Sequence, residues 1–255
     1  MSSPKHEQLT ATLRDRIDGD FYTDGRIPSE ANLVGEFRVS RTTVRAALTA
    51  LQNEGLLRAQ SGVGYFVRKF RHFMYRPQDD FQRKKLTAEA DSFTRAGTAE
   101  GRNPSQRIDV SMIPAPEDVA RRLGVARGEF VVLRSRLRLL DGEPFQLNDS
   151  YYPRDVAEGT AVMSADDIPR GVNQVLADHG FAQVRALDEV WVRMPRPPEV
   201  ERLRIPPGTP VAEHIITGFT CDDRAVRMVR AVLPGDRNVI TFDRTHPDHD
   251  AELSA

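Results

Sequence analysis

Arginine and hydroxyl side chains gather at the start of one amphipathic segment. Arg41, Thr42, Thr43 and Arg45 directly follow Ser40. At about 100° per residue, Thr42 points away from the apolar stripe of this segment, and its neighbours flank it. Arginine can pair bidentately with guanine, and threonine can bind phosphate or contact a thymine methyl group. The pattern therefore suits the major groove of duplex DNA, and the alternative is an ordinary solvated helix face.

A second group of arginines alternates with apolar residues in a β-strand pattern. Arg136 and Arg138 are two residues apart, so their side chains lie on the same side of the strand. If that side faces a cavity, two guanidinium groups converge on an anion such as a phosphate or a carboxylate. The alternative is a solvated outer face. Because Arg134 continues the series, not all three side chains need to face inward.

The remaining reactive residue types give no catalytic pattern. No paired carboxylates, nucleophile motif or phosphate-binding loop stands out, so we expect no enzyme activity, catalytic residue or cofactor. The single cysteine, Cys221, is expected to be a packed or surface thiol rather than a nucleophile. His246 and His249 lie in a polar, acidic C-terminal segment, for which a disordered tail is favoured over a metal site.

The arginine and hydroxyl side chains of residues 40–45 must be positioned by a helix, a tight turn, a second helix and a hairpin. Ser29 is the expected N-cap of a helix beginning at Glu30, and Ser40 that of a helix beginning at Arg41. Gly55 is expected to end the second helix. The predicted buried stripe of this helix consists of Val44, Ala47, Leu48 and Leu51. This arrangement predicts a helix-turn-helix, followed by a hairpin that turns at residues 61–64.

Length and composition indicate an ordinary globular protein with two domains. The chain has 255 residues, 39% of them hydrophobic, and a net charge of −1. A near-neutral charge neither supports nor excludes nucleic-acid binding, because basic residues can gather on one face. One cysteine excludes an intrachain disulfide and fits a reducing cytoplasm, and no apolar run is long enough to span a membrane. We predict a DNA-binding domain over residues 1–69, a linker over 70–89, a second domain over 90–245 and a tail over 246–255.

The second domain is expected to be an antiparallel sheet with few helices. Asp141 and Gly142 form a strong hairpin signal between two apolar segments, and helices are predicted over residues 117–123 and 172–179. Trp191 alternates with valines, which favours the core or a dimer interface. Strands are predicted over residues 107–113, 130–140, 144–152, 184–194, 211–220, 226–233 and 239–242. The fold class is therefore α+β.

The first half resembles the winged helix-turn-helix domain of the GntR family of bacterial transcription regulators. The matching motifs are Ile-Pro-Ser-Glu at 27–30, Val-Ser-Arg-Thr-Thr-Val-Arg at 39–45, Glu-Gly-Leu-Leu at 54–57 and Gly-Val-Gly-Tyr-Phe-Val at 62–67. The resemblance implies operator contacts from Ser40, Arg41, Thr42, Thr43 and Arg45. It also implies that Ser61 and Gly62, in the wing, reach the minor groove. Ala31 departs from the arginine that many members carry there.

The second half resembles the UTRA domain, the effector-binding half of the HutC subgroup of GntR regulators. The supporting motifs are Asp-Ser-Phe-Thr at 91–94, Val-Ala-Arg-Arg-Leu-Gly-Val at 119–125, Arg-Leu-Arg-Leu-Leu-Asp-Gly-Glu-Pro at 136–144, Tyr-Tyr-Pro at 151–153 and Pro-Gly-Asp-Arg at 234–237. The resemblance implies a chorismate-lyase-like fold and a homodimer. It also implies that Arg136 and Arg138 hold an anionic group and that Thr94 lines the pocket.

Several pocket positions depart from the family pattern. Gly171, Val172 and Asn173 stand where sugar-phosphate sensors have Ser-Leu-Tyr. Arg227 and Asn148 stand where many members have glutamate. The effector therefore need not be a sugar phosphate, although the backbone at Gly171 and the side chain of Asn173 are still expected to contribute.

These observations predict a cytoplasmic, homodimeric repressor that binds a short palindromic operator in double-stranded DNA. A small polar or anionic effector is expected to release it from the operator. One alternative is a dimeric repressor that needs no ligand. The other is an enzyme built on the lyase-like domain, against which the lack of a catalytic constellation argues.

Overall fold

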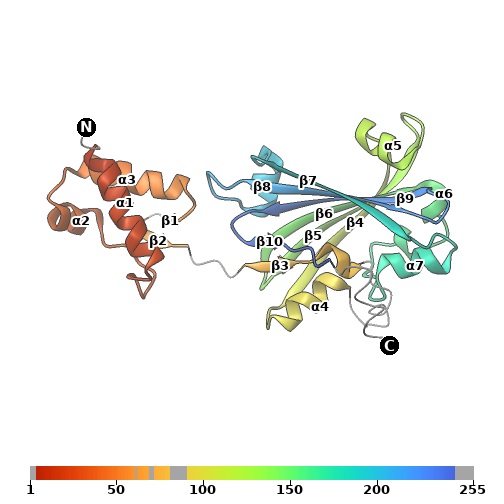
Figure 1. Ribbon diagram of the computed structural model, residues 1–255, viewed down its shortest axis with the longest axis horizontal. Coiled ribbons are helices and arrows are strands. Elements are labelled where there is room, and N and C mark those ends of the chain that lie inside the picture. The colour runs from red at the N-terminus through yellow and green to blue at the C-terminus, as the bar shows by residue number, and fades with distance from the viewer. Residues whose placement is uncertain (1–3, 61, 69–71, 81–90, 245–255) are drawn as a thin grey trace. The chain divides into compact units, whose positions relative to one another are not determined.

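The computed structural model describes residues 4–60, 62–68, 72–80 and 91–244. The chain separates into two compact units (Figure 1). The first comprises Met1–Arg71 with Met194–Val211, and the second comprises His72–Arg193 with Ala212–Ala255. Among the described residues, no helix is long and apolar enough to cross a membrane.

The first unit is built from three helices and a short hairpin. Its elements are α1 (Lys5–Asp18), α2 (Glu30–Phe37), α3 (Arg41–Asn53), β1 (Leu57–Gln60) and β2 (Gly64–Val67), together with α8 (Pro197–Leu203) from the later segment. The predicted stripe of α3 is confirmed, because Val44, Ala47, Leu48 and Leu51 are all fully buried. They pack with Leu9 and other apolar residues of α1 and α2 in one core.

The predicted helix caps are confirmed by their hydrogen bonds. The Ser29 hydroxyl accepts from the Asn32 amide at 3.2 Å, and the Ser40 hydroxyl accepts from the Thr43 amide at 3.1 Å. Between the two helices, Arg38 adopts a left-handed conformation at φ 51°. This single turn residue redirects the chain, so that α2 and α3 form the expected helix-turn-helix. Gly55, at φ 75°, follows the last turn of α3 as predicted.

The hairpin of β1 and β2 has the predicted position. The strands are antiparallel, with Leu57 opposite Val67 and Gln60 opposite Gly64. The segment before α2 adds to this hairpin, since the Ile27 amide donates to the Tyr65 carbonyl at 2.9 Å. The hairpin is therefore tied to the start of α2 as well as to the end of α3.

The second unit contains a six-stranded sheet in the order β4-β5-β6-β9-β8-β7 (Figure 1). Its strands are β4 (Pro104–Pro114), β5 (Phe130–Leu140), β6 (Glu143–Pro153), β7 (Arg185–Arg193), β8 (Val211–Phe219) and β9 (Ala225–Pro234). The pairs β4–β5, β5–β6 and β6–β9 are antiparallel. The predicted Asp141-Gly142 turn joins β5 to β6, and both residues have positive φ, as a tight hairpin requires.

Helices cover both faces of this sheet. The helices and short turns of the unit are α4 (Ser92–Ala99), α5 (Glu117–Leu123), α6 (Arg154–Ala157), α7 (Val172–Asp178), η1 (Pro77–Asp80) and η3 (Ala161–Met163). On one face, Val131 packs with α5. On the other face, Val132 packs with α6 and α7, whereas Leu140 packs with α4. The arginines of β5 lie between these last two clusters, so apolar packing flanks them at both ends.

A short parallel pair completes the second unit. β3 (Phe73–Tyr75) pairs with β10 (Asn238–Ile240). The described part of residues 70–89, predicted as a linker, therefore contains β3 and η1. Phe73 and Tyr75 are buried, which explains why this stretch is ordered as a strand against the unit that follows it.

Candidate functional site

The first candidate site is the exposed surface at the N-terminus of α3. Arg41, Thr42 and Arg45 are exposed there, and Thr43 is half-buried. The hydroxyl groups of Ser40 and Thr43 lie 2.8 Å apart, so these two side chains brace the first turn. A helix N-terminus attracts anions through its free amides, and two arginines add positive charge to it.

One carboxylate holds both arginines of this surface. Glu30 accepts hydrogen bonds from Nε of Arg41 at 3.0 Å and from Nε of Arg45 at 3.0 and 3.1 Å. Partial burial acts to raise the pKa of the Glu30 carboxyl, but these hydrogen bonds outweigh it and lower the pKa below its ordinary value. Because Nε is engaged on each arginine, the terminal guanidinium nitrogens remain the groups that can reach outward.

The hairpin and α3 enclose a groove of about 550 Å³. The Arg26 guanidinium donates to the Val63 carbonyl at 3.1 Å and so fixes the hairpin turn from the other side. Gly62 has φ 73° and Gly64 has φ 129°, and these values require glycine in a turn this tight. Gly62 lines the groove together with Arg41 and Arg45, as expected for a shared binding surface. Ser61, the other predicted wing contact, lies outside the described residues.

In the second unit, the three arginines of β5 all point inward. Arg134, Arg136 and Arg138 are buried, so the solvated-face alternative is wrong for this strand. Arg136 donates to the Asn148 side chain and, at 3.0 Å, to the Ser150 hydroxyl. Nε of all three arginines lacks a hydrogen-bond partner among the described residues. A buried guanidinium with unused donors is a costly arrangement unless an acceptor arrives.

Arg138 is held by groups from α4 and its cap. Its Nη2 lies 3.7 Å from Oδ2 of Asp91, and its guanidinium carbon lies 4.8 Å from the centre of the Phe93 ring. Asp91 also caps α4 by accepting from the Thr94 amide at 2.8 Å. The same carboxylate therefore connects the start of α4 to the arginine on β5.

A fourth buried arginine reaches the cluster from β9. Arg227 donates to Oδ1 of Asn173 at 2.7 Å, and Gln183 donates to the same oxygen at 2.9 Å. Asn173 lies in the first turn of α7, which Gly171 precedes at φ 78°. Arg227 also lies 3.5 Å from the Ser150 hydroxyl. The family departures at positions 173 and 227 are therefore in direct contact with each other.

The pKa values reflect the burial of charged groups in this site. Burial, reinforced by the charge of Arg138, lowers the pKa of Arg136 to about 10. Burial also lowers the pKa of Arg134. For Asp91, burial acts to raise the pKa, but the charge of Arg138 and the Thr94 amide outweigh it and lower the pKa below its ordinary value. The site thus destabilises cations and stabilises an anion.

A small cavity of about 40 Å³ brings the predicted effector residues together. Arg136, Arg138, Gly171 and Asn173 all line it. Thr94 is not among its lining residues, because its amide faces Asp91 in the cap of α4. Ser92 and Arg95, which sequence reasoning did not select, line the cavity in its place. A larger cavity of about 410 Å³ adjoins the same residues, since both are lined by Asp79, Ser92, Arg95 and Arg138.

Two residues that contact the candidate sites, Glu30 and Asp91, are not predicted as site residues from the sequence. Glu30 was read as the first residue of a helix, and its link to Arg41 and Arg45 depends on how α2 packs against α3. Asp91 was noticed only within a motif. The signal that was available for Asp91 is its N-cap position before a Ser-Phe-Thr segment, which predicts a helix start.

A helix-turn-helix with a wing, joined to an α+β sheet unit, defines a class of DNA-binding transcription regulators. Residues 5–67 match the family described as "Bacterial regulatory proteins, gntR family", and residues 99–238 match the "UTRA domain". The chain belongs to the GntR family of regulators and carries a UTRA domain.

Named relatives agree with this assignment. The chain is 30% identical over 240 residues to an uncharacterized HTH-type transcriptional regulator of Rhizobium meliloti (strain 1021), covering 90% of this chain and 92% of the relative. It is 28% identical over 237 residues to the HTH-type transcriptional repressor NagR of Bacillus subtilis (strain 168), covering 92% of each. The crystal structure of PhnF from Mycobacterium smegmatis has a TM-score of 0.57 at 24% identity, covers 92% of this chain and 98% of that chain, and shares the fold. These relatives are transcriptional regulators, not enzymes.

Proposed function

We propose that this protein is a repressor that leaves its operator when a small anionic molecule binds in the cavity of about 40 Å³ lined by Arg136 and Arg138, which we call the arginine cavity. The observation that carries the proposal is the composition of that cavity, which is lined by five arginines and two aspartates. Three of the arginines, Arg136, Arg138 and Arg227, are buried. Their Nε atoms have no hydrogen-bond partner among the described residues, and an anion would supply acceptors for these buried guanidinium groups.

The operator-binding surface in this proposal is the N-terminus of α3 with the wing. Arg41 and Arg45 would read base edges, while Ser40, Thr42 and Thr43 would contact phosphate or thymine methyl groups. Gly62 would allow the wing backbone to approach the minor groove. Two copies of this surface would bind the two halves of a short palindrome in cytoplasmic DNA.

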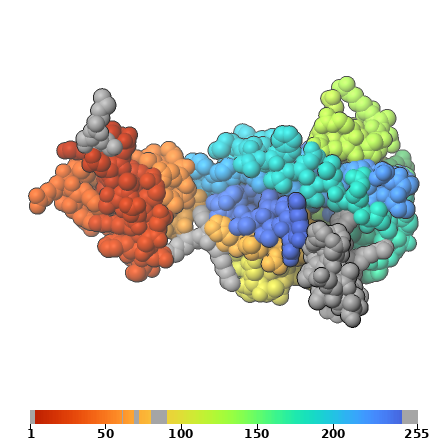
Figure 2. Space-filling model, in the orientation of Figure 1, coloured from red at the N-terminus to blue at the C-terminus, as the bar shows by residue number. Residues whose placement is uncertain are grey.

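The homodimer in this proposal uses the β7 edge of the sheet. Trp191 is 58% exposed, so the core reading of this residue is wrong, and the interface reading stays a prediction. Val190, Val192 and Leu187 on the same strand are exposed as well. The opposite edge, β4, exposes mainly polar residues such as Ser105, Arg107 and Asp109. The teal part of the chain that contains β7 lies at the surface in Figure 2. An edge strand with exposed apolar residues is a site for pairing with another chain.

The coupling between ligand and operator would start at β3. Five residues separate the end of β2 from the start of this strand, which is the first described element of the second unit. Tyr75 and Phe73 on β3 pack in the cluster that also contains Phe93 of α4. Since Ser92 and Arg138 line the cavity beside α4, a ligand that shifts α4 would shift β3 and with it the connection to the wing.

A screen on the full-length protein tests the proposal. Phosphosugars, carboxylates and nucleotides are tested one by one for a rise in melting temperature and for release of operator DNA in a fluorescence anisotropy titration. We expect at least one anion to do both, and to lose both effects in the Arg136→Ala/Arg138→Ala variant. A releasing anion that acts equally on the variant places the effector elsewhere. No releasing anion at all would favour a dimeric repressor that needs no ligand.

A further inference from the structure

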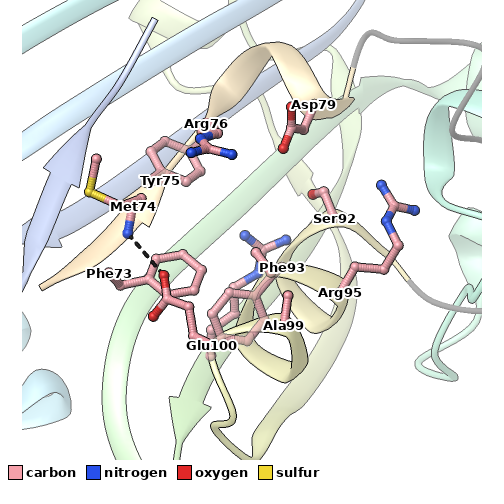
Figure 3. A pocket seen from close by; sticks show the side chains of 12 residues that line it. Phe73, Met74, Tyr75, Arg76, Asp79, Ser92, Phe93, Arg95, Ala99 and Glu100 are labelled. Carbon is pink, nitrogen blue, oxygen red and sulfur yellow. Dashed lines mark hydrogen bonds between the residues drawn. The ribbon is translucent and has the colours of Figure 1, made fainter. Parts of the chain in front are cut away.

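The larger cavity beside the arginines has a composition of its own. It lies between α4 on one side and β3 with η1 on the other (Figure 3). Its volume of about 410 Å³ is within the range of small-molecule sites. Ser92, Arg95, Ala96 and Ala99 line it from α4, so one face of this helix runs along it.

At one end of the cavity stands a carboxylate with an unused oxygen. Oε1 of Glu100 accepts weakly from the Met74 amide at 3.5 Å, as Figure 3 shows. Oε2 of Glu100 is buried and has no hydrogen-bond partner among the described residues. A buried carboxylate oxygen is normally paired, so this one marks a place where a donor is missing.

The middle of the cavity is apolar. Phe73 and Phe93 line it, and their ring centres lie 5.8 Å apart. Both rings are buried and belong to the same hydrophobic cluster, so they form a fixed wall. An alkyl chain or a flat apolar body would contact them without requiring any polar partner.

The other end of the cavity is charged, with Arg95 and Arg138 together with Asp79. Arg138 lines both cavities, and its Nε lacks a partner among the described residues. Glu100 and Ser92 stand at opposite ends of α4, eight residues apart, which corresponds to about 12 Å along a helix axis. The cavity thus has two arginines and one aspartate at one end, an apolar middle and a carboxylate at the far end.

We propose that the effector is an elongated molecule with an anionic group at one end and a primary ammonium at the other. The carboxylate or phosphate binds Arg136 and Arg138, the chain lies against Phe73 and Phe93, and the ammonium donates to Oε2 of Glu100. This inference rests on the proposed function, because it assigns the anionic end to the same arginines. It adds a second recognition point that acts directly on β3, since the ligand ammonium and the Met74 amide share one carboxylate.

The experiment compares matched ligands on the full-length protein by isothermal titration calorimetry. One series runs from γ-aminobutyrate to ω-aminooctanoate, each paired with the fatty acid of equal length, and a second series pairs ω-aminoalkyl phosphates with alkyl phosphates. We expect at least one aminated ligand to bind about tenfold or more tightly than its partner. Glu100→Gln should remove this preference and leave the affinity for the unaminated partner unchanged. Glu117→Gln, which neutralises an exposed carboxylate on α5, is the control and should keep the preference.

Three results would overturn the inference, and the first two have different meanings for the repressor. If unaminated anions bind through Arg138 and release the operator as well as the aminated ones, the proposed function stands and the role of Glu100 is wrong. If neither series binds wild-type protein or releases operator DNA, the role of Glu100 is wrong and the arginine site loses its support too. An amine preference that survives in Glu100→Gln also contradicts the inference.

Discussion

Nε of Arg45 lies 3.0 and 3.1 Å from the two carboxylate oxygens of Glu30. The same carboxylate accepts from Nε of Arg41 at 3.0 Å. Glu30 thus holds both guanidinium groups on the exposed side of α3. We therefore propose that Glu30 acts as a positioning residue for operator recognition rather than as a direct contact.

Glu30→Gln should change operator selectivity more than total DNA binding. Loss of the carboxylate frees both arginines and removes a negative charge from the DNA-facing surface, so binding to random DNA should strengthen. Binding to operator should gain less, because the arginines are no longer oriented. We expect the ratio of operator to random affinity to fall about tenfold, which corresponds to about 1.4 kcal/mol. Anisotropy titrations at one fixed salt concentration measure both affinities, and an unchanged ratio would contradict the positioning role.

Arg45→Ala should weaken specific operator binding by about 1–3 kcal/mol if its guanidinium contacts a base edge. Arg45 is well suited to this contact because its side chain is 62% exposed and its terminal nitrogens are not used by Glu30. Arg14→Ala is the matched control, since Arg14 lies on α1 and pairs with Glu54. Equal affinities of wild type and Arg45→Ala for operator would rule out the base contact.

Trp191→Asp should convert the proposed dimer to a monomer. The substitution places a charge in the exposed apolar segment of β7, where burial against a second copy would leave it unpaired. Sedimentation equilibrium of the full-length protein at micromolar concentration measures the change. Met112→Asp on the β4 edge is the control, because Met112 is also exposed and lies on the opposite edge of the sheet. A dimer that persists in Trp191→Asp, or that dissociates in Met112→Asp, would place the interface elsewhere.

The acid dependence of stability should identify Asp91 as a paired carboxylate. Its pKa is lowered in the folded protein, so its stabilising contribution is complete above the unfolded value of about 3.9 and is lost as pH falls through the folded pKa. The melting temperature of wild type should therefore fall more steeply than that of Asp91→Asn below about pH 4. Circular dichroism melts across this range provide the measurement. Asp155→Asn removes a carboxylate that is 62% exposed and should retain the wild-type slope.

The arginine cavity should make ligand binding visible as stability. An anion at about a hundred times its dissociation constant should add roughly 2.7 kcal/mol to the free energy of unfolding. Arg136→Ala/Arg138→Ala should remove this gain while operator binding is retained, since both residues lie in the second unit. Arg154→Ala/Arg185→Ala, which removes two exposed arginines of the same unit, should keep the full gain. Equal stabilisation of the cavity variant by the releasing anion would contradict the assignment.

Much of the fold follows from local signals in the sequence. Ser29 and Ser40 were predicted as caps because a hydroxyl before a helix accepts from its first free amides, and this depends on neighbouring residues alone. The Asp141-Gly142 turn was predictable for the same reason. In contrast, α4 was not predicted, because Gly97 and two threonines make its sequence a weak helix former. Its stability depends on packing of Phe93 against Phe73 and Phe145, which are distant in the sequence.

The candidate sites, like the fold, could be predicted from the sequence only in part. The arginines of β5 were found from their spacing, but spacing could not decide between a solvated face and a buried one. The answer depends on α4 and α7, which cover that face and bring Asp91 and Asn173 to it. The bond between Arg227 and Asn173 could not be inferred, since 54 residues separate them and both depart from the family pattern.

Selection from random duplex DNA tests most directly whether α3 and the wing read a specific duplex sequence. Wild-type protein is incubated with a random library at fixed salt, and the bound DNA is sequenced over successive rounds. We expect enrichment of one short inverted repeat, and its loss with Arg41→Ala/Arg45→Ala. A library that stays random, or a repeat enriched equally by the variant, would contradict the account.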